Sequence, residues 1–391
     1  MARSGVAYHV AGIIGRVRRE GDGALEYFSR KFDGVSLKAA DFRVAPAGKK
    51  SLQKSIPAQL RLALERAAEN IKTFHRAEMR RLPRSWQVKK GAITTGQVLT
   101  PVAAAGMYVP GGRYSYPSTV LMAAIPAKIA GVKRLAMVTP PKNLTQAVLY
   151  AAALAGVDEI YRIGGAHAVA ALAFGTKTIA KVDLIVGPGN AYVNEAKRQL
   201  LGTVGIDALA GPSEVAIIAD SACPPEFIAA DVSAQAEHDP QARCFVFSDS
   251  KTLIAKVKKL LPEEFKSQVT LLECSASEAI ARVNGMAPEH LELLMKKPEE
   301  IARRITNAGA VFAGYGTPTA LGDYWAGPSH VLPTGTSARF SSGLSCATFI
   351  KRTSFMKAGR LSPAETAAAA AIAQAEGLKF HSDSIRIREE K

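Results

Sequence analysis

Residues 103–138 read AAAGMYVPGGRYSYPSTVLMAAIPAKIAGVKRLAMV, and this stretch decides the fold class. Two short apolar runs, 103–108 and 134–138, flank a glycine-rich turn and an alanine-rich segment of helical character. A buried strand, a turn, a helix and a second buried strand are typical of a parallel sheet that is covered by helices. The same alternation continues along the chain. We interpret further apolar runs as strands at 159–163, 182–186, 214–219, 243–248, 290–295 and 309–313.

Eight such units are too many for one comfortable sheet. The sequence therefore predicts an α/β protein with two doubly wound, incomplete Rossmann-like domains, small helical parts at both ends, and an intertwined homodimer. The divisions fall just before Tyr108 and near 210–213. The predicted parts are 1–107 with 215–342 as the first Rossmann-like domain, 108–214 as the second and NAD-binding one, and 343–391 as a C-terminal helical region that reaches the partner subunit.

Composition excludes several classes of protein. Hydrophobic residues make up 48% of the 391 residues, which excludes a disordered chain, and no apolar run is long enough to span a membrane. The N-terminus lacks a convincing signal-peptide cleavage site, so we expect a cytoplasmic protein without membrane contact. The four cysteines form no Cys-x-x-Cys pair, so we expect them to be buried and reduced. A metal site must then use histidine, carboxylate or amide groups.

The formal net charge of +16 would attract anionic partners. The basic residues are dispersed, however, and lack the interleaved aromatic side chains of a groove that stacks bases. A nucleic-acid-binding protein is the alternative from another functional class, and it would leave the histidines of the chain without a role. We therefore expect no nucleic-acid partner.

Three turns after predicted strands are rich in glycine: 108–112, 163–167 and 186–190. Glycine permits a close approach of ligand to backbone, and the N-terminus of the following helix favours anions. None of the turns contains a full Gly-x-Gly-x-x-Gly motif. Each turn is therefore consistent with a cofactor site and equally with tight packing of helix on strand.

A second group of polar residues follows the strand at 214–219. Gln235 and His238 are three residues apart in a predicted helix, so their side chains point the same way. This arrangement suits a divalent metal such as zinc, although an ordinary polar helix face is the alternative. Helical spacing adds Asp231 as a third ligand. Glu289 and His290 could act as acid and base if a turn brings the two neighbours together.

The set of motifs resembles the histidinol dehydrogenase family, almost from end to end. The motifs that carry the resemblance are Tyr-Val-Pro-Gly-Gly from Tyr108, Gly-Pro-Gly-Asn-Ala-Tyr-Val from Gly187, Ala-Gly-Pro-Ser-Glu from Ala210, Gln-Ala-Glu-His from Gln235, Ala-Pro-Glu-His-Leu from Ala287, Gly-Asp-Tyr from Gly322, Ser-His-Val-Leu-Pro-Thr from Ser329, and Phe349-Ile-Lys-Arg352.

The resemblance implies a zinc- and NAD-dependent enzyme that oxidises L-histidinol to L-histidine through L-histidinaldehyde. It implies one zinc ion per subunit, held by Gln235, His238 and Asp323 of one subunit and by His381 from the tail of the other. It therefore implies a homodimer with shared active sites. It also makes Asp323, and not Asp231, the expected third ligand. Asp231 is then a residue that supports the ligands or the fold.

The resemblance also implies roles for the remaining residues. Glu289 would activate water and His290 would accept protons. The implied substrate-binding set is Ser213, Gln235, His238, His290, Asp323, His330, Glu376 and His381, and the implied NAD-binding set is Tyr108, His167 and Asn190.

Two departures bear on this interpretation. His167 stands where the family usually has glutamine, and the N-terminal part of the family pattern is shortened. A related enzyme that oxidises another small alcohol, such as a sulfonated diol, is the alternative. Ser213, His330 and Glu376 argue against it, because they would hold the amine and imidazole of histidinol.

Overall fold

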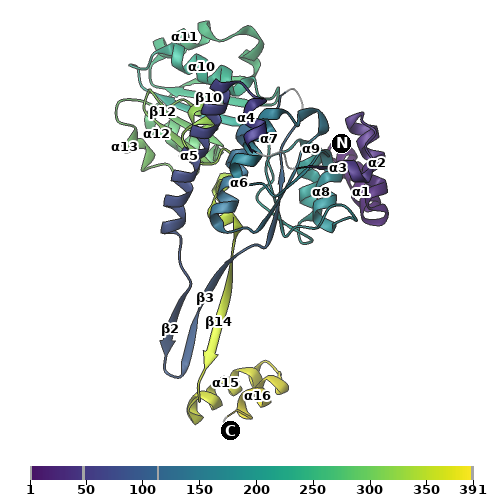
Figure 1. The fold of residues 1–391 in the computed structure, drawn as a ribbon. Helices are drawn as coiled ribbons and strands as arrows, with labels where there is room; N and C mark the ends of the chain where they lie inside the picture. Colours follow the sequence, from purple (N-terminus) through teal and green to yellow (C-terminus); the bar gives the residue numbers. More distant parts are fainter. Residues whose placement is uncertain (1, 46–48, 112–113, 389–391) are drawn as a thin grey trace. The chain divides into compact units, whose positions relative to one another are not determined.

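The computed structural model describes residues 2–45, 49–111 and 114–388 (Figure 1). The chain divides into two compact units. The first comprises Met1–Arg81 and Val102–Phe349, and the second comprises Leu82–Pro101 and Ile350–Lys391. Gly112, the last residue of the first glycine-rich turn, lies outside the described residues. No described helix combines the length and the apolar character that crossing a membrane requires.

A six-stranded sheet forms the first half of the larger unit, in the order β1-β6-β5-β4-β7-β8. The two-residue strand β1 is antiparallel to β6, and the other neighbours are parallel. The bounds are β1 Arg43–Val44, β4 Ala104–Tyr108, β5 Arg134–Val138, β6 Glu159–Tyr161, β7 Leu184–Val186 and β8 Gly205–Ile206.

Helices cover both faces of this sheet. The face that includes Ala136, Val138 and Ile185 packs against α1, α2, α8 and α9, while α6 contacts β4 and β5 and packs on α7. The bounds are α1 Ala2–Glu20, α2 Asp22–Phe28, η1 Ser29–Asp33, α3 Ala39–Phe42, α4 Lys49–Lys54, α5 Ala58–Arg81, α6 Pro117–Ala130, η2 Pro141–Asn143, α7 Gln146–Ala155, α8 Gly165–Phe174 and α9 Ala191–Leu200.

A five-stranded parallel sheet follows, in the order β11-β10-β9-β12-β13. Its strands are β9 Glu214–Ala219, β10 Arg243–Ser248, β11 Val269–Glu273, β12 His290–Leu294 and β13 Ala310–Ala313. Alternate residues of β9 face opposite ways, as the pleat of a strand requires. Val215 and Ile217 pack under α10 and α11, whereas Ala216 and Ile218 pack under α12 and α13 (Figure 1).

The remaining helices of this half connect or follow its strands. The bounds are α10 Pro225–Ala236, α11 Lys251–Leu260, η3 Glu263–Gln268, α12 Ala276–Met286, α13 Pro298–Ala302, α14 Thr319–Tyr324, η4 Ser337–Arg339 and η5 Cys346–Phe349.

The second unit is a three-stranded antiparallel sheet followed by two helices. Strand β3 lies between β2 and β14, and its whole length pairs with β14. A capping box at Ser362 and Glu365 begins α15, where each residue satisfies a backbone N–H of the other. The bounds are β2 Trp86–Lys90, β3 Ile93–Pro101, β14 Ile350–Ala358, α15 Pro363–Ala375 and α16 Lys379–Arg386.

The structure confirms all eight predicted strands and corrects their grouping. We expected 1–107 to join 215–342, but β4 lies inside the first sheet and β1 pairs with β6. The first sheet therefore includes residues before Tyr108, because β4, which is buried along its whole length, is a central strand between β5 and β7, and β1 adds an edge strand beside β6. The expected division near 210–213 coincides with the change from the first sheet to the second.

A second correction concerns the C-terminal region. We expected 343–391 to be helical, but 350–358 form β14, whose partner β3 lies about 250 residues earlier in the chain. An isolated strand has no hydrogen-bonding partners of its own, so such a distant pairing gives only a weak local signal. The sequence also did not indicate five further strands, which are β1, β2, β3, β8 and β11.

Candidate active site

Glu289 and His290 lie at the amino end of β12, an inner strand of the second sheet. Ala287, just before them, has a left-handed backbone with a φ of 48°, so the chain turns there as the acid and base interpretation requires. The carboxylate Oε2 of Glu289 and the Nδ1 of His290 are 3.8 Å apart. Both residues are buried, at 7% and 5% exposure.

Burial sets the protonation of this pair. It raises the pKa of Glu289 to about 8, against the lowering effect of the Glu214 N–H, which donates to Oε2 at 3.2 Å. Burial lowers the pKa of His290 to about 4. Both shifts disfavour the charged form. At neutral pH the ligand-free site therefore holds a protonated Glu289 and a neutral His290, and the neutral imidazole can accept a proton.

Three of the four predicted metal ligands come together. Gln235 lies in the last turn of α10, His238 follows the helix, and Asp323 belongs to α14. All three line one cavity of about 50 Å³. An amide oxygen, an imidazole nitrogen and a carboxylate oxygen are a donor set that suits zinc, and the exposure of His238 leaves room for a further ligand.

Asp231 turns to a different partner. Its carboxyl group lies beside that of Glu292 on β12. Glu292 also accepts hydrogen bonds from the backbone N–H of Thr319, at 2.8 Å, and from the Thr319 hydroxyl. Thr319 is the first residue of α14. These contacts join the elements that carry Gln235, His290 and Asp323.

Ser213 and His330 border the same site. Ser213 lies close enough to Glu289 to lower the pKa of that carboxyl group, although burial outweighs this effect. His330 contacts Asp323 through Nδ1, at 3.1 Å from the backbone oxygen, and its Nε2 is 3.2 Å from the hydroxyl of Thr119 on α6. Burial lowers the pKa of His330. Thr119 thus links the helix after β4 to the predicted substrate residues.

A larger cavity of about 560 Å³ opens beside the predicted ligands. His238 and Asp323 lie in its wall, and apolar residues of α5 and α6 line the rest together with Tyr116 and Trp325. A mostly apolar cavity with a few convergent polar groups is typical of a site for a small molecule.

The three predicted cofactor residues lie at three different turns, which follow β4, β6 and β7. Tyr108 ends β4, and its hydroxyl accepts the N–H of Gly165 at 3.0 Å. His167 follows in α8, only 1% exposed, with its Nε2 3.7 Å from the Asp33 carboxylate and its ring near Phe28. Tyr108 is 3% exposed, so only Asn190 of the three is open to solvent.

A ligand contact by His167 stays a prediction, and it would require the segment that carries Phe28 and Asp33 to move. Glu376 and His381 belong to the second unit, so their contribution to the site also stays a prediction.

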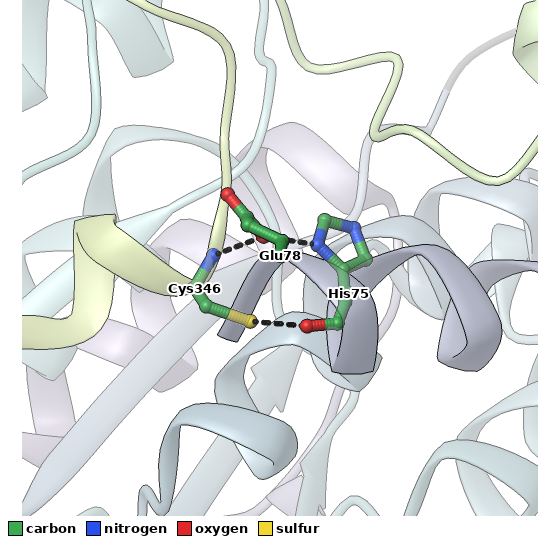
Figure 2. Close-up of side chains that lie close together, drawn as sticks. All are labelled: His75, Glu78 and Cys346. Atoms are coloured by element: carbon green, nitrogen blue, oxygen red, sulfur yellow. Dashed lines mark hydrogen bonds and ion pairs between the residues drawn. The ribbon is translucent and has the colours of Figure 1, made fainter. Parts of the chain in front are cut away.

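His75, Glu78 and Cys346 form another cluster of potential metal ligands (Figure 2). Each member already has a partner. His75 Nδ1 and Glu78 Oε2 are 2.7 Å apart, and the N–H of Cys346 donates to the same oxygen at 3.2 Å. Burial raises the pKa of the Cys346 thiol, which donates to the carbonyl oxygens of His75 and Pro126. A protonated thiol is a poor metal ligand. The cluster therefore serves to fasten η5 to α5.

Sequence reasoning missed two buried charged groups around the site. Glu292 occupies an otherwise apolar strand, and this interruption was the available signal. Lys197 lies in α9 and pairs with Asp207, and nothing in its spacing separates it from the exposed basic residues of the helix.

Two open α/β sheets with glycine-rich turns, and a buried carboxyl and imidazole beside a set of zinc-type ligands, are features typical of an oxidoreductase. The sequence profile of the histidinol dehydrogenase family matches residues 1–389. The chain belongs to the histidinol dehydrogenase family.

Individual relatives agree with the family assignment. The chain is 47% identical to the histidinol dehydrogenase of Caulobacter vibrioides over 97% of its own length and 91% of the relative's. It is 46% identical to that of a Synechococcus strain over the same shares. The crystal structure of histidinol dehydrogenase from Elizabethkingia anophelis superimposes with a TM-score of 0.89 at 34% identity, covering 98% of this chain and 92% of that one.

Proposed function

We propose that the protein oxidises L-histidinol to L-histidine in two NAD-dependent steps, with L-histidinaldehyde held between them. The observation that carries the proposal is the buried Glu289 and His290 pair beside Gln235, His238 and Asp323. Relatives at 44–47% identity that are named histidinol dehydrogenase support the choice of substrate over a sulfonated diol.

His290 accepts the hydroxyl proton of histidinol in the first step, because its imidazole is neutral at working pH. In the second step Glu289 takes a proton from the water that adds to the aldehyde, which requires Glu289 to be ionised at that stage. When bound, NAD would supply the hydride acceptor for each step, and a zinc ion held by Gln235, His238 and Asp323 would supply Lewis-acid binding of the substrate. Ser213 and His330 bind the polar groups of the substrate.

Gln235, His238 and Asp323 would hold the zinc ion together with His381 from a second copy of the chain. The protein is then a homodimer whose active sites are each shared by two chains. Glu376, five residues before His381, would bind the substrate amine from the same tail. The biosynthetic role of the family supports a cytoplasmic location.

NADH formation tests the reaction. We expect turnover of histidinol and none of a sulfonated diol, with two NADH produced per histidinol. Metal analysis should find about one zinc ion per chain. Active protein without stoichiometric metal, or protein that does not oxidise histidinol, would contradict the proposal.

Mixing two inactive variants tests the shared site. His238→Ala and His381→Ala should each be inactive alone. If His381 serves the neighbouring chain, each mixed dimer regains one intact site, and random mixing restores roughly a quarter of the wild-type activity. No recovery after mixing, with dimer exchange verified, would place His381 in the site of its own chain.

A further inference from the structure

Lys197 is a buried cation that the reaction does not use. Its side chain is 1% exposed, and Nζ lies 2.5 Å from Asp207 Oδ1 and 2.9 Å from the carbonyl oxygen of Gly187. Asp207 Oδ2 accepts the N–H of Gly187 at 2.7 Å, and Oδ1 also accepts the N–H of Ala208 at 2.7 Å. The ion pair therefore binds both backbone polar groups of Gly187.

Gly187 is a position where small shifts are not tolerated. Its φ is 105°, a backbone conformation that residues with a side chain rarely adopt. A Cβ atom there would lie 2.3 Å from the backbone oxygen of Tyr108. Gly187 thus packs directly on the end of β4. It is the first residue of the turn 187–190 that leads from β7 into α9.

The same turn ends at Asn190, the exposed member of the predicted cofactor set. The Oδ1 of Asn190 caps α9 by accepting the N–H groups of Tyr192 and Val193, both at 3.1 Å. This cap uses the amide oxygen and leaves the amide nitrogen to meet a ligand. Asn194, one turn later, donates to the carbonyl oxygen of Gly189 at 2.8 Å.

Stability alone does not explain a buried ion pair here. The cost of removing both charges from water offsets much of their attraction, so apolar residues of similar size are often as stable. Apolar residues could fill the space of Lys197 and Asp207, but they could not bind the N–H and carbonyl groups of Gly187. The contacts to Gly187 are what the charged pair adds.

We propose that Lys197 and Asp207 are positioning residues for the cofactor. They fix Gly187 against β4 and so hold the turn 187–190 where Asn190 meets NAD. This inference rests on the proposed function, because it takes Asn190 to be a cofactor contact.

The test replaces the pair by apolar residues. In the double variant Lys197→Met with Asp207→Leu, neither charge is left unpaired, and the space stays filled. We expect the KM for NAD to rise at least about 10-fold, with kcat at saturating NAD and the KM for histidinol within about threefold of wild type. When NADH is titrated into the double variant without histidinol, calorimetry should show an affinity that is lower by a similar factor.

The matched control is a more exposed ion pair of the same helix. Arg198 and Glu195 form an ion pair there, with Arg198 56% exposed. Arg198→Met with Glu195→Gln should leave both KM values unchanged. Lys197→Gln is a milder second variant, which keeps a neutral donor for Gly187 and should show a smaller rise in the KM for NAD.

Unchanged NADH binding in the folded double variant, or equal changes in the KM values for both substrates, would overturn the inference. If the double variant does not fold, Lys197→Gln decides, and a wild-type NADH affinity in that variant would overturn the inference. Failure of the proposed function is distinguishable, because wild-type protein would then not oxidise histidinol, whatever its affinity for NADH.

Discussion

Replacing Glu292 by glutamine should make the stability of the protein less sensitive to alkaline pH. Glu292 is fully buried in β12, and its carboxyl group faces that of Asp231. Thr319 donates to Oε1. Among the described residues no N–H or hydroxyl group donates to Oε2. The two carboxyl groups can therefore hydrogen-bond only while one of them carries a proton.

The raised pKa values of this pair determine the sign of the effect. Burial, aided by the charge of Asp231, raises the pKa of Glu292 from 4.5 to about 8, and burial raises that of Asp231 from 3.8 to about 6. The folded protein keeps a proton that the unfolded chain releases. The stabilisation is thus full below pH about 4 and is lost as the pH rises through about 8. A tenfold change in an acid dissociation constant corresponds to about 1.4 kcal/mol, so the loss is on the order of a few kcal/mol.

Glu292→Gln cannot ionise, but its amide can accept from Thr319 and donate to Asp231. We expect its urea midpoint to be close to that of wild type at pH 5 and to exceed it increasingly from pH 6 to 9. Glu292→Leu leaves the Thr319 N–H unpaired and should be destabilised at every pH, by about 1–3 kcal/mol. Glu299→Gln, on an exposed residue, is the control. Parallel curves for wild type and Glu292→Gln across this pH range would refute the shared proton.

Three further predictions concern the site and its surroundings. His238→Ala should lose zinc and activity together, whereas Cys346→Ser should retain zinc. Metal analysis after dialysis checks both variants. Zinc loss in Cys346→Ser would show that the cluster of His75, Glu78 and Cys346 is a metal centre. His290→Asn should lower kcat by about 10²–10⁴ with little change in the KM for histidinol, as measured from NADH formation; a wild-type kcat would exclude proton transfer by this residue. Gly187→Ala should lower the melting temperature and weaken NADH binding, because the new Cβ meets the Tyr108 backbone; unchanged binding would show that the turn tolerates displacement.

The sequence predicted the strands well because each central strand is buried on both faces. Runs such as those of β4 and β7 are continuous and apolar, and parallel strands with this pattern need no distant information to be recognised. It predicted the sheet membership of residues 1–107 poorly. The pairing of β1 with β6, and of β3 with β14, joins segments that lie more than 100 residues apart in the chain, and no local pattern indicates such a partner.

The candidate site was predictable to a similar extent. Residues with rare chemistry in compact motifs, such as Gln235 with His238 and Glu289 with His290, were found from spacing and resemblance. The buried polar residues Glu292, Lys197 and Asp207 were not, because much of their hydrogen bonding is to backbone groups. Such contacts are made by many residue types, so they leave no motif in the sequence.

The predicted site residues lie at the carboxyl ends of strands in the first sheet and at the amino end of a strand in the second. Tyr108 and the turn 187–190 lie at the carboxyl ends of β4 and β7, where the helices that follow begin. His290 lies at the amino end of β12, and Gln235 lies near the end of α10. The N-terminus of a helix attracts anions and the C-terminus attracts cations. We therefore expect the first of these strand ends to suit an anionic group of the cofactor and the second to suit a divalent cation, which would place cofactor and metal in different halves of one unit.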